Sequence, residues 1–500
     1  MTNMHDTLSP LRADARPALS DPTLLREAAL IGGDWLAAGA MPSIEVTSPA
    51  SGAPVGHVPD CGRAETEAAI AAANASWSDW KARTAHDRAA LLERWHALVL
   101  ANVDDLARIM TAEQGKPLAE AEGEIRYAAT FIKWFAEEGR RVGGRTIAAP
   151  ERDRRIIALA EPIGVSAAIT PWNFPAAMIT RKCAPALAAG CPVVIKPSDL
   201  TPFTAIALIE LAMRAGFPKG TISLLTGKPD AIGAAITASP VVRKLSFTGS
   251  TRVGALLMRQ SADTIKKLSL ELGGNAPLIV FEDADLDLAV RATIASKFRN
   301  SGQTCVCANR ILVADAVHDA FAGKLARAVS ELVAAPGDEA GSTIGPLINA
   351  AAVAKVSAHY DDVLALGGTL VAEGQGREDG NFVRPKVLTG ARPDMVLARE
   401  ETFGPLAALF RFTSEDEALE LANATEYGLA SYFYTRDLSR AFRVAERLES
   451  GMVALNTGSL AMEMAPFGGI KQSGLGREGG HAGIEEYLET KAFHIGGLEL

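Results

Sequence analysis

The chain has 500 residues, of which 48% are hydrophobic and 22% charged, a balance typical of a globular protein. This length predicts about two to four domains and a large buried core. The formal net charge of −9 argues against a nucleic-acid partner, because nucleic-acid-binding proteins carry clustered positive charge.

The cysteines and the first residues indicate the cellular compartment. The number of cysteines is odd and their spacing is not that of a disulfide framework, which indicates a reducing compartment. The cysteines are Cys61, Cys183, Cys191, Cys305 and Cys307. The first twenty residues mix charges of both signs and lack the apolar core of a secretory signal. Because no apolar run is long enough to span a bilayer, we expect a cytoplasmic protein with no membrane partner.

Residues up to about Pro22 are polar and are expected to be loosely held. From Ala64 to Glu138 apolar residues recur at helical spacing, which predicts a helical region. From Glu161 short apolar strands alternate with helices. The strands are predicted at Val165–Thr170, Pro192–Lys196, Thr221–Leu225, Lys244–Phe247 and Lys267–Leu270. Helices are predicted from Pro175 to Ala189, from Pro202 to Ala215 with Thr201 as N-cap, over Ala231–Ala238 and after Gly249.

Repeated strand–helix units predict a parallel sheet that is covered by helices and binds ligands at the carboxyl ends of its strands. A second α/β unit is predicted with strands at Leu278–Phe281, Ile311–Val313, Phe382–Val387, Leu406–Phe412 and Met452–Leu455. Two further β-like segments, Arg154–Ala160 and Lys491–Leu500, have no obvious partner strand nearby in the sequence. We expect these two segments to pair between subunits.

A reactive thiol is the strongest chemical signal. Cys305 lies among small and turn-forming residues in Ser301–Cys307, and Glu271 is followed by Leu272 and two glycines. A nucleophile, a base and glycine hinges together indicate covalent catalysis on a carbonyl, and a few per cent of an ordinary cysteine is already thiolate near neutral pH. The alternative for a single cysteine is an inert, buried, small apolar residue.

Two glycine-rich segments have the spacing of phosphate-binding loops. Gly474, Gly476 and Gly479 match Gly-x-Gly-x-x-Gly, but no strand precedes them and too little chain follows for a βαβ unit, so a plain loop is favoured. The segment Phe247–Gly254, with Gly249 and Ser250, follows a predicted strand and opens a helix whose free N–H groups suit a phosphate. Plain strand–helix packing is the alternative.

Polar residues follow two strands of the first sheet. Lys196 could reach ribose hydroxyls from the segment Lys196–Asp199, which contains Ser198, and Asp199 could repel a 2′-phosphate; a solvated loop is the alternative. Asn173, in Pro171–Pro175, could donate its side-chain N–H to an oxyanion. An asparagine there could instead cap the helix, but the following Phe-Pro delays the helix and leaves the amide free.

Two arginines could bind an anionic substrate. Arg181 lies in the second turn of the helix that Pro175 opens, and Arg299 lies six residues before Cys305. Either could hold an anionic tail bidentately, or could instead pair with a core carboxylate. No metal is expected, because Asp283, Asp285 and Asp287 lack the rest of a calcium loop and the histidines lack zinc spacing.

With these motifs in this order, the chain from about Ile31 to its end resembles the NAD(P)-dependent aldehyde dehydrogenases, and most closely the succinate-semialdehyde dehydrogenase branch. The resemblance implies that Cys305 is the nucleophile, that Glu271 is the general base, and that Asn173 forms an oxyanion hole with the Cys305 N–H. The remaining matches are Lys196 at the adenosine ribose, Ser250 at the pyrophosphate, Glu401 at the nicotinamide ribose, Trp172, Lys182 and Phe403 in the cofactor region or beside it, and Glu478 near the proton path. Gly254, Ser198 and Asp199 belong to the same predicted cofactor site, for NAD or alternatively NADP.

The resemblance also implies an architecture. We expect an α/β fold with a Rossmann-like cofactor domain from residues 1–142 and 161–273, an α/β catalytic domain from 274–470, and a small β oligomerisation flap with a C-terminal segment from 143–160 and 471–500. Members of the family are usually homodimers or homotetramers, so a homo-oligomer is expected here.

The implied substrate is a small anionic aldehyde, with succinate semialdehyde favoured. In the branch both arginines and a loop serine bind the substrate carboxylate, but Ala461 stands at that serine position and Ser459 lies two residues away. Glutarate semialdehyde, or a sulfonated aldehyde such as sulfolactaldehyde, is therefore an alternative substrate. Cys307 suggests a redox switch through a disulfide with Cys305. Two other classes stay open, namely a cofactor-independent cysteine hydrolase and a non-catalytic binding protein.

Overall fold

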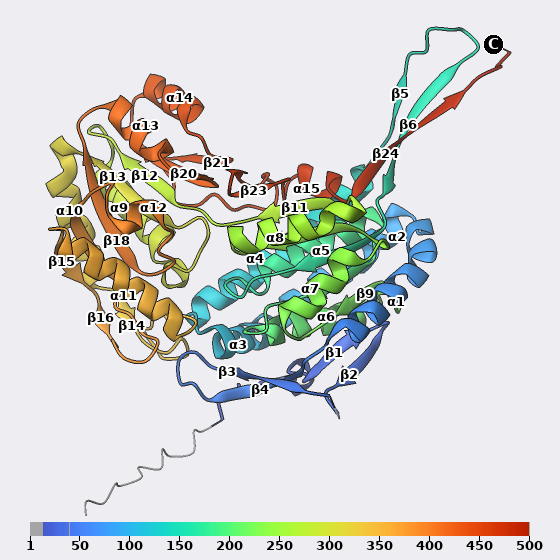
Figure 1. Ribbon diagram of the computed structural model, residues 1–500, viewed down its shortest axis with the longest axis horizontal. Helices are drawn as coiled ribbons and strands as arrows, with labels where there is room; N and C mark the ends of the chain where they lie inside the picture. Colours follow the sequence, from blue (N-terminus) through green and yellow to red (C-terminus); the bar gives the residue numbers. More distant parts are fainter. Residues whose placement is uncertain (1–13, 40, 500) are drawn as a thin grey trace, which may run out of the picture.

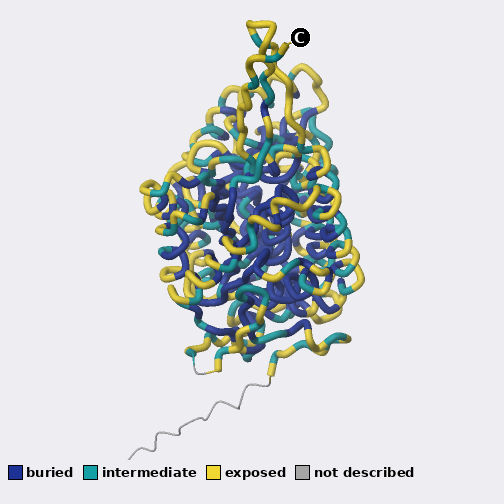
Figure 2. The backbone as a smooth tube through the Cα atoms, turned by 90° about the vertical axis from the view of Figure 1, so that its right-hand side faces the viewer, coloured by how far each residue is buried: buried dark blue, intermediate teal, exposed yellow. Residues whose placement is uncertain are grey.

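The computed structural model describes residues 14–39 and 41–499, and they form two α/β units and a projecting β-sheet (Figure 1). The loosely held N-terminal segment predicted up to Pro22 lies mostly outside these residues. Within the described part, the backbone N–H groups of Ser20 and Asp21 both donate to the carboxylate of Asp105 at 2.8 Å. Burial is concentrated in the two units, and the projecting sheet is largely exposed (Figure 2).

The first unit contains an eight-stranded sheet in the order β2-β1-β9-β8-β7-β10-β11-β23. Its centre is parallel, as predicted, and its bounds are β9 Ile222–Leu224, β8 Val193–Lys196, β7 Val165–Ile169, β10 Val242–Thr248 and β11 Lys267–Glu271. Antiparallel strands that the sequence patterns did not predict close its edges: β1 Ala28–Ile31, β2 Asp34–Ala37 and β23 Gly474–Leu475.

Helices cover both faces of this sheet because its central strands are apolar on both sides. Consecutive residues such as Ala167 and Ala168 on β7 point to opposite faces and belong to different hydrophobic clusters, one on each face. The helical region predicted before Glu138 is α1 Arg63–Ala82, α2 Ala85–Ala101, α3 Val103–Gln114 and α4 Leu118–Glu138. The helices after the strands are α5 Ala177–Ala189, α6 Pro202–Ala215, α7 Pro229–Ala238 and α8 Thr251–Ser261.

Two of these helices are capped by distant residues. Helix α5 starts at Ala177 instead of the predicted Pro175, whereas helix α6 starts at Pro202 with Thr201 as N-cap, as predicted, but without a side-chain capping bond from Thr201. In both cases a buried glutamate from elsewhere accepts the first N–H groups: Glu124 binds the N-terminus of α5 and Glu113 binds that of α6. Sequence patterns cannot reveal such caps because the capping residue is distant in the chain.

The second unit contains a seven-stranded sheet in the order β15-β17-β18-β13-β12-β20-β21. Its bounds are β15 Thr369–Glu373, β17 Lys386–Ala391, β18 Leu406–Phe412, β13 Ala308–Ala314, β12 Ala276–Val280, β20 Ala430–Tyr434 and β21 Met452–Leu455. The strand predicted at Phe382–Val387 was misplaced. Pro385 has no N–H for a ladder bond, so pairing starts at Lys386, and Phe382 is a buried loop residue.

The projecting sheet has the order β24-β6-β5, with β5 Arg145–Ile147, β6 Arg155–Pro162 and β24 Leu488–Ile495. The expectation that the two orphan segments pair between subunits was wrong, because β24 pairs with β6 of the same chain along all eight residues. The two strands are far apart in sequence, so only the fold brings them together. Apolar side chains are nevertheless exposed on this sheet, including Ile147 and Phe493.

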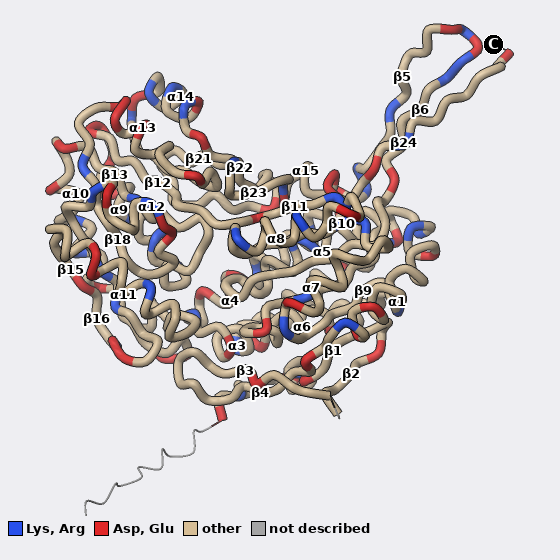
Figure 3. The backbone as a smooth tube through the Cα atoms, viewed as in Figure 1, with Lys and Arg blue, Asp and Glu red and all other residues tan. Residues whose placement is uncertain are grey.

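Charged residues of both signs are interspersed over both units, without a continuous basic face in this view (Figure 3). None of the described helices is long and apolar enough to cross a membrane. Among the described residues no cluster of three or more metal-ligating side chains is present, and Asp285 instead caps α9 Leu286–Lys297 by accepting from the Leu288 N–H at 3.0 Å.

Candidate active site

A cavity of about 290 Å³ brings several predicted catalytic and cofactor residues together, whereas the predicted residues Glu271, Lys196, Ser198, Asp199 and Gly254 do not line it. It lies at the carboxyl ends of β7 and β10, where parallel sheets bind ligands. The second unit supplies the opposite wall. Predicted residues that line it are Trp172, Asn173, Gly249, Ser250, Cys305, Glu401 and Phe403.

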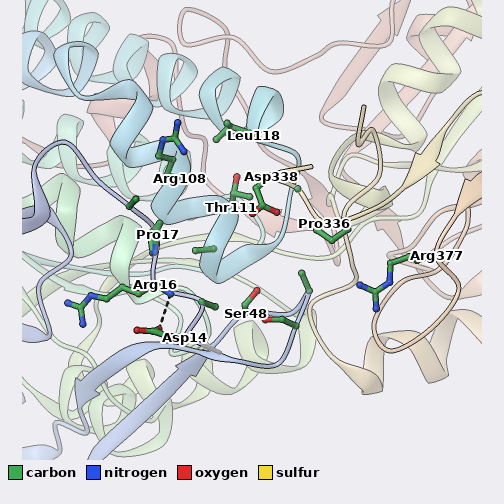
Figure 4. Close-up of a pocket in the computed structure, with 16 residues that line it drawn as sticks. Asp14, Arg16, Pro17, Ser48, Arg108, Thr111, Leu118, Pro336, Asp338 and Arg377 are labelled. Atoms are coloured by element: carbon green, nitrogen blue, oxygen red, sulfur yellow. Dashed lines mark hydrogen bonds between the residues drawn. The ribbon is translucent and has the colours of Figure 1, made fainter. Parts of the chain in front are cut away.

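A larger cavity of about 560 Å³ lies elsewhere, between the segment around Arg16, helix α3 and the loop around Gly337 (Figure 4). Its lining includes Arg108, Thr111 and Asp338 but none of the predicted site residues. Size alone therefore does not locate the chemistry, and the smaller cavity, which contains the thiol, is the candidate active site.

Cys305 is partly exposed in the smaller cavity and follows an unusual turn. Asn300, Ser301 and Gly302 have φ values of 51°, 57° and 76°, which is costly for the two non-glycine residues. Side-chain bonds hold this turn: Ser301 Oγ donates to the Gly345 carbonyl at 2.8 Å, and Gln303 Oε1 accepts from the Ile348 N–H at 2.9 Å. The sequence patterns did not reveal these contacts, because Gly345 and Ile348 lie more than forty residues away.

The thiol is not acidic in this setting. Burial raises the pKa of Cys305 to about 12, the nearby Arg181 lowers it, and Glu401 and Glu271 raise it further. An ordinary cysteine is a few per cent thiolate near neutral pH, but the raised pKa disfavours the thiolate of Cys305. A proton must leave the sulfur as it attacks, so a neighbouring base is required.

Asn173 is tied more firmly than the sequence predicted. Its side-chain Nδ2 donates to the Gln303 carbonyl at 2.9 Å, so the amide is not wholly free, and it does not cap α5. Because an amide nitrogen carries two hydrogens, a second N–H remains for the cavity that Asn173 lines. The Cys305 backbone N–H donates to no group in the described part of the chain. The two together can form the predicted oxyanion hole.

Glu271 ends β11 and is buried, and neither of its carboxylate oxygens has a hydrogen-bond partner among the described residues. Burial and the neighbouring charge of Glu478 raise the pKa of Glu271 well above its ordinary value, against the opposing effect of Arg181 and Lys182. A raised pKa is what a general base needs in order to accept a proton near neutral pH, as predicted. Gly468 leaves room for this carboxylate, since a Cβ there would lie 2.8 Å from Glu271 Oε1.

Glu478, also buried, has the opposite environment. It forms ion pairs with Lys182 and, at 2.6 Å, with Arg181, and it accepts from Ser246 Oγ at 3.2 Å. Although burial acts in the other direction, Lys182 and Arg181 lower the pKa of Glu478 to about 2. Glu478 is therefore a permanent negative charge next to Glu271.

The two predicted substrate arginines occupy different environments. Arg181 is buried, its guanidinium lies 4.0 Å from the ring centre of Phe467, and it does not line the cavity. Arg299 is exposed and lies 5.1 Å from the ring centre of Phe174. Both arginines act electrostatically on Tyr127: burial raises the pKa of its hydroxyl, and the charges of Arg181 and Arg299 lower it. The sequence patterns did not single out Tyr127.

At the cofactor end, Ser250 is the N-cap of α8 and accepts from the Val253 N–H at 3.4 Å. Lys196 is buried and its Nζ lies 3.8 Å from Asp199 Oδ1. Burial lowers the pKa of Lys196 and Asp199 raises it. Ser198 Oγ accepts from the Leu200 N–H at 3.2 Å, and Gly254 packs on Leu272, where a Cβ would lie 2.4 Å from a methyl group.

Glu401 stands on the opposite wall. Burial raises its pKa to about 8, against the effect of Lys355 and other donors, and its Oε1 has no hydrogen-bond partner among the described residues. Phe403 has a φ of 54° and meets Trp172 edge to face, with ring centres 5.6 Å apart. Lys355, on α11 Ala350–Ala365, also lines the cavity and was missed from the sequence.

Comparison with known proteins identifies the family. The model of the aldehyde dehydrogenase family matches residues 35–493, which is most of the chain. The chain belongs to the aldehyde dehydrogenase family. It is 58% identical over 482 residues to the 3-sulfolactaldehyde dehydrogenase of Pseudomonas putida, covering 96% of this chain and 99% of that protein. It is also 58% identical over 479 residues to the NADP(+) succinate-semialdehyde dehydrogenase GabD of Escherichia coli strain K12, with the same coverage.

A solved structure agrees with this assignment. The crystal structure of a succinate-semialdehyde dehydrogenase from Burkholderia pseudomallei has a TM-score of 0.95 and 60% identity, covering 96% of this chain and 100% of that one. The two-sheet fold is therefore that of the aldehyde dehydrogenases, and the chain is an oxidoreductase of this family.

This aldehyde dehydrogenase has a cavity that fits the nicotinamide dinucleotide of its family. The N-terminus of α8 at Ser250 suits a pyrophosphate, and the unpartnered oxygen of Glu401 can accept from a ribose hydroxyl. Gly249 has no room for a side chain, since a Cβ there would lie 2.5 Å from the Phe247 ring.

The two residues of the predicted substrate loop, Ala461 and Ser459, lie in different environments. Ala461 packs against the hydrophobic core of the second unit, as Cys305 does, whereas Ser459 is exposed. Ser459 therefore does not take the place of the loop serine that the family has at position 461. Cys307 is a free, buried thiol that accepts a hydrogen bond from Lys297 Nζ at 3.4 Å.

Proposed function

We propose that this aldehyde dehydrogenase oxidises succinate semialdehyde to succinate with NAD or NADP as the hydride acceptor. One observation carries the proposal: a single cavity joins a thiol, an amide donor and a cofactor-binding carboxylate, namely Cys305, Asn173 and Glu401. Glutarate semialdehyde and sulfolactaldehyde are the alternative substrates.

In the proposed reaction the Cys305 sulfur attacks the aldehyde carbon, and its proton passes to a neighbouring base. Asn173 Nδ2 and the Cys305 N–H stabilise the negative oxygen that forms, and one such donor is worth about 2.7–4 kcal/mol in the transition state. When bound, a nicotinamide dinucleotide held by Ser250 and Glu401 would supply the hydride acceptor, and loss of the hydride would leave a thioester on Cys305. Glu271 then takes a proton from water, and the resulting hydroxide breaks the thioester and releases the acid.

The choice of substrate rests on positive charge. Arg299 is exposed beside Phe174, and the buried Arg181 adds a second positive charge near Cys305, because both arginines lower the pKa of that thiol. Ala461 has no side-chain hydroxyl to offer the substrate anion, so glutarate semialdehyde and sulfolactaldehyde stay as alternative substrates. The names of the relatives agree with this: at 58% identity one is a 3-sulfolactaldehyde dehydrogenase, one a succinate-semialdehyde dehydrogenase and one a glutarate-semialdehyde dehydrogenase.

A panel of neutral, carboxylated and sulfonated aldehydes tests the substrate class through kcat/KM. We expect the anionic aldehydes to be preferred, and Arg299→Ala to lower kcat/KM for them while neutral aldehydes are unaffected. Arg291, which is exposed on α9, supplies the control variant Arg291→Ala. A preference for neutral aldehydes with a silent Arg299→Ala would contradict the anion-binding role.

For the cofactor, the carboxylate of Asp199 beside Lys196 favours NAD over NADP, since a 2′-phosphate would meet a negative charge. The ratio of kcat/KM for the two cofactors, in the parent chain and in Asp199→Asn, measures this preference. We expect NAD to be preferred and Asp199→Asn to move the ratio toward NADP.

For the assembly we propose a homodimer or homotetramer, with residues 143–160 and 471–500 as the oligomerisation flap, residues 1–142 and 161–273 as the cofactor domain and residues 274–470 as the catalytic domain. The exposed apolar side chains of Ile147, Leu159 and Phe493 on the projecting sheet support this role for the flap. Light scattering of the parent chain and of Phe493→Lys tests it, and an unchanged mass in Phe493→Lys would argue against the sheet as the interface.

A further inference from the structure

The segment from Gln114 to Glu124 contacts both walls of the active site without lining it. It runs from the last residue of α3 into the first turns of α4. Gln114, Lys116 and Glu124 are buried, and Glu120 is half-buried. The backbone N–H of Lys116 donates to Gln114 Oε1 at 3.0 Å, which holds the segment together.

Toward the first wall, this segment holds Asn173. Glu124 Oε1 accepts from the backbone N–H groups of Ala176 and Ala177, at 2.9 and 3.2 Å, and so caps the helix that follows Asn173. Lys116 forms an ion pair with Glu124 Oε2, and its Nζ donates to the backbone carbonyl of Asn173 at 3.0 Å. The main chain from the Asn173 carbonyl to Ala177 is thereby anchored.

Toward the second wall, the same segment holds the turn before Cys305. Gln114 Nε2 donates to Asn300 Oδ1 at 2.9 Å, and Glu120 Oε2 accepts from the Asn300 backbone N–H at 2.8 Å. Asn300 in turn donates from Nδ2 to the Asn173 carbonyl at 2.9 Å. These bonds hold Asn300 at its φ of 51°, a conformation that would otherwise be costly.

Neither sheet by itself fixes the distance between Asn173 and Cys305. Asn173 follows β7 of the first sheet, whereas Cys305 precedes β13 of the second. A misplacement of about 1 Å between reacting groups can cost about 100-fold in rate. Contacts that bridge the two loops therefore have a direct bearing on catalysis.

We propose that Gln114, Lys116, Glu120 and Glu124 form a positioning clamp that sets the Asn173 amide against the Cys305 sulfur. None of the four touches the reacting atoms, so they are positioning residues. The inference rests on the proposed function, because it assumes that Asn173 stabilises an oxyanion formed at Cys305.

Two reactions of the same thiol separate positioning from general damage. Acylation of Cys305 by p-nitrophenyl acetate forms the carbon–sulfur bond through an oxyanion and expels p-nitrophenolate, with the thiol proton lost to solvent. Alkylation by iodoacetamide displaces iodide and forms no oxyanion. Neither reaction needs the nicotinamide cofactor. Cys305 is partly exposed while the other four cysteines are buried, and Cys305→Ala gives the blank for both reagents.

The chain offers a matched control in Glu113, one residue before the clamp. It is a buried glutamate that caps a helix N-terminus as Glu124 does, accepting from Phe203 and Thr204 at 2.7 and 2.8 Å. The helix it caps, α6, does not contain Asn173. The variants are therefore Lys116→Met and Glu124→Gln in the clamp, Glu113→Gln as control and Asn173→Ala as reference, all in the full chain.

We expect Lys116→Met and Glu124→Gln to slow acylation about 10- to 100-fold while alkylation changes less than about threefold. Glu113→Gln should change neither rate by more than that. Equal changes in both reactions of the clamp variants, or none in either, would overturn the clamp, provided that Asn173→Ala slows acylation selectively. If Asn173→Ala itself leaves acylation unchanged, the oxyanion role in the proposed function fails instead.

Discussion

The acids at the cavity wall and the acid directly behind it have opposite environments. At the wall, Glu401 lines the cavity and Glu271 is buried next to the lining residue Leu272. Both have carboxylate oxygens without hydrogen-bond partners among the described residues, and burial raises the pKa of both, that of Glu401 to about 8. Behind it, Glu478 is buried as well, but Lys182 and Arg181 lower its pKa to about 2. Burial alone therefore does not set the charge of an acid here. Direct ion pairing does, because Glu478 contacts Arg181 and Lys182 whereas neither oxygen of Glu271 has a hydrogen-bond partner among the described residues.

The same contrast divides the residues by task. Groups on the wall have free hydrogen-bonding capacity and can exchange protons with substrate or water. Groups behind it are saturated: Lys182 Nζ, for example, donates to Ser246 Oγ at 3.0 Å in addition to its pairing with Glu478. Pre-organised catalysis needs reactive groups at the cavity that are held in place by fully bonded groups behind them.

The largest expected effect is the loss of the wall thiol. Cys305→Ala should abolish aldehyde oxidation, because Cys305 is the only thiol among the described residues that line the cavity, yet should leave cofactor binding intact. Steady-state reduction of the nicotinamide and a fluorescence titration with the cofactor measure the two properties. Retained turnover would remove Cys305 from the mechanism.

Next, Glu271→Gln removes the wall base while keeping its shape. Hydrolysis of the thioester should slow by about 10²–10⁴-fold, the usual contribution of a general base. A rapid-mixing experiment should then show one equivalent of reduced nicotinamide followed by a very slow steady state. A normal steady-state rate would count against the role of Glu271 as base.

Glu478→Gln tests the region behind the wall. It leaves Arg181 and Lys182 buried without their counter-charge, which should cost about 3–5 kcal/mol in the free energy of unfolding by denaturant. The variant also removes the negative charge that raises the pKa of Glu271, so the acidic limb of the kcat profile, which includes thioester hydrolysis, should move to lower pH. An unchanged acidic limb would mean that the charge of Glu478 does not affect the pKa of Glu271.

The stability of the parent chain should follow from the same pairing. Because the folded pKa of Glu478 is lowered from 4.5 to about 2, its stabilising contribution is fully present above about pH 4.5 and is lost as the pH falls toward 2. In Glu478→Gln this part of the acid-unfolding curve should be absent. Unfolding midpoints measured between pH 6 and pH 3 in both proteins check the difference.

A smaller effect is expected at the substrate loop. Ala461→Ser supplies a hydroxyl at the inward-facing position, and a bond to an anionic substrate should gain about 1.5–3 kcal/mol, seen as a lower KM for succinate semialdehyde. Ser459→Ala is the control, because that side chain is exposed and should be silent. A silent Ala461→Ser would mean that the substrate anion does not reach this loop.

The smallest effect concerns Cys307, for which a disulfide with Cys305 remains a hypothesis. If it forms, peroxide should inactivate the parent chain reversibly, with rescue by a thiol reductant, whereas Cys307→Ala should lose that reversibility. Under reducing conditions Cys307→Ala should be nearly as active as the parent. Equal sensitivity of both proteins to peroxide would contradict the switch.

Much of the fold could be predicted because its signals are local. Strand and helix periodicities located the five central strands of the first sheet within one or two residues at most ends. Failures came where the determining contact is distant: β24 pairs with β6, and Glu124 from α4 sets the start of α5. Local patterns contain no information about such partners.

By itself the sequence determined the α/β class and the family resemblance, because local periodicity and motif order define these. From residue type and spacing it also predicted a nucleophile, a base and an amide donor. Only the tertiary structure decided that Cys305 is weakly acidic, that Glu478 is permanently charged beside Glu271, and that Arg181 is held in an ion pair. Protonation and positioning depend on desolvation and on charges a few ångströms away, and folding alone brings those groups together.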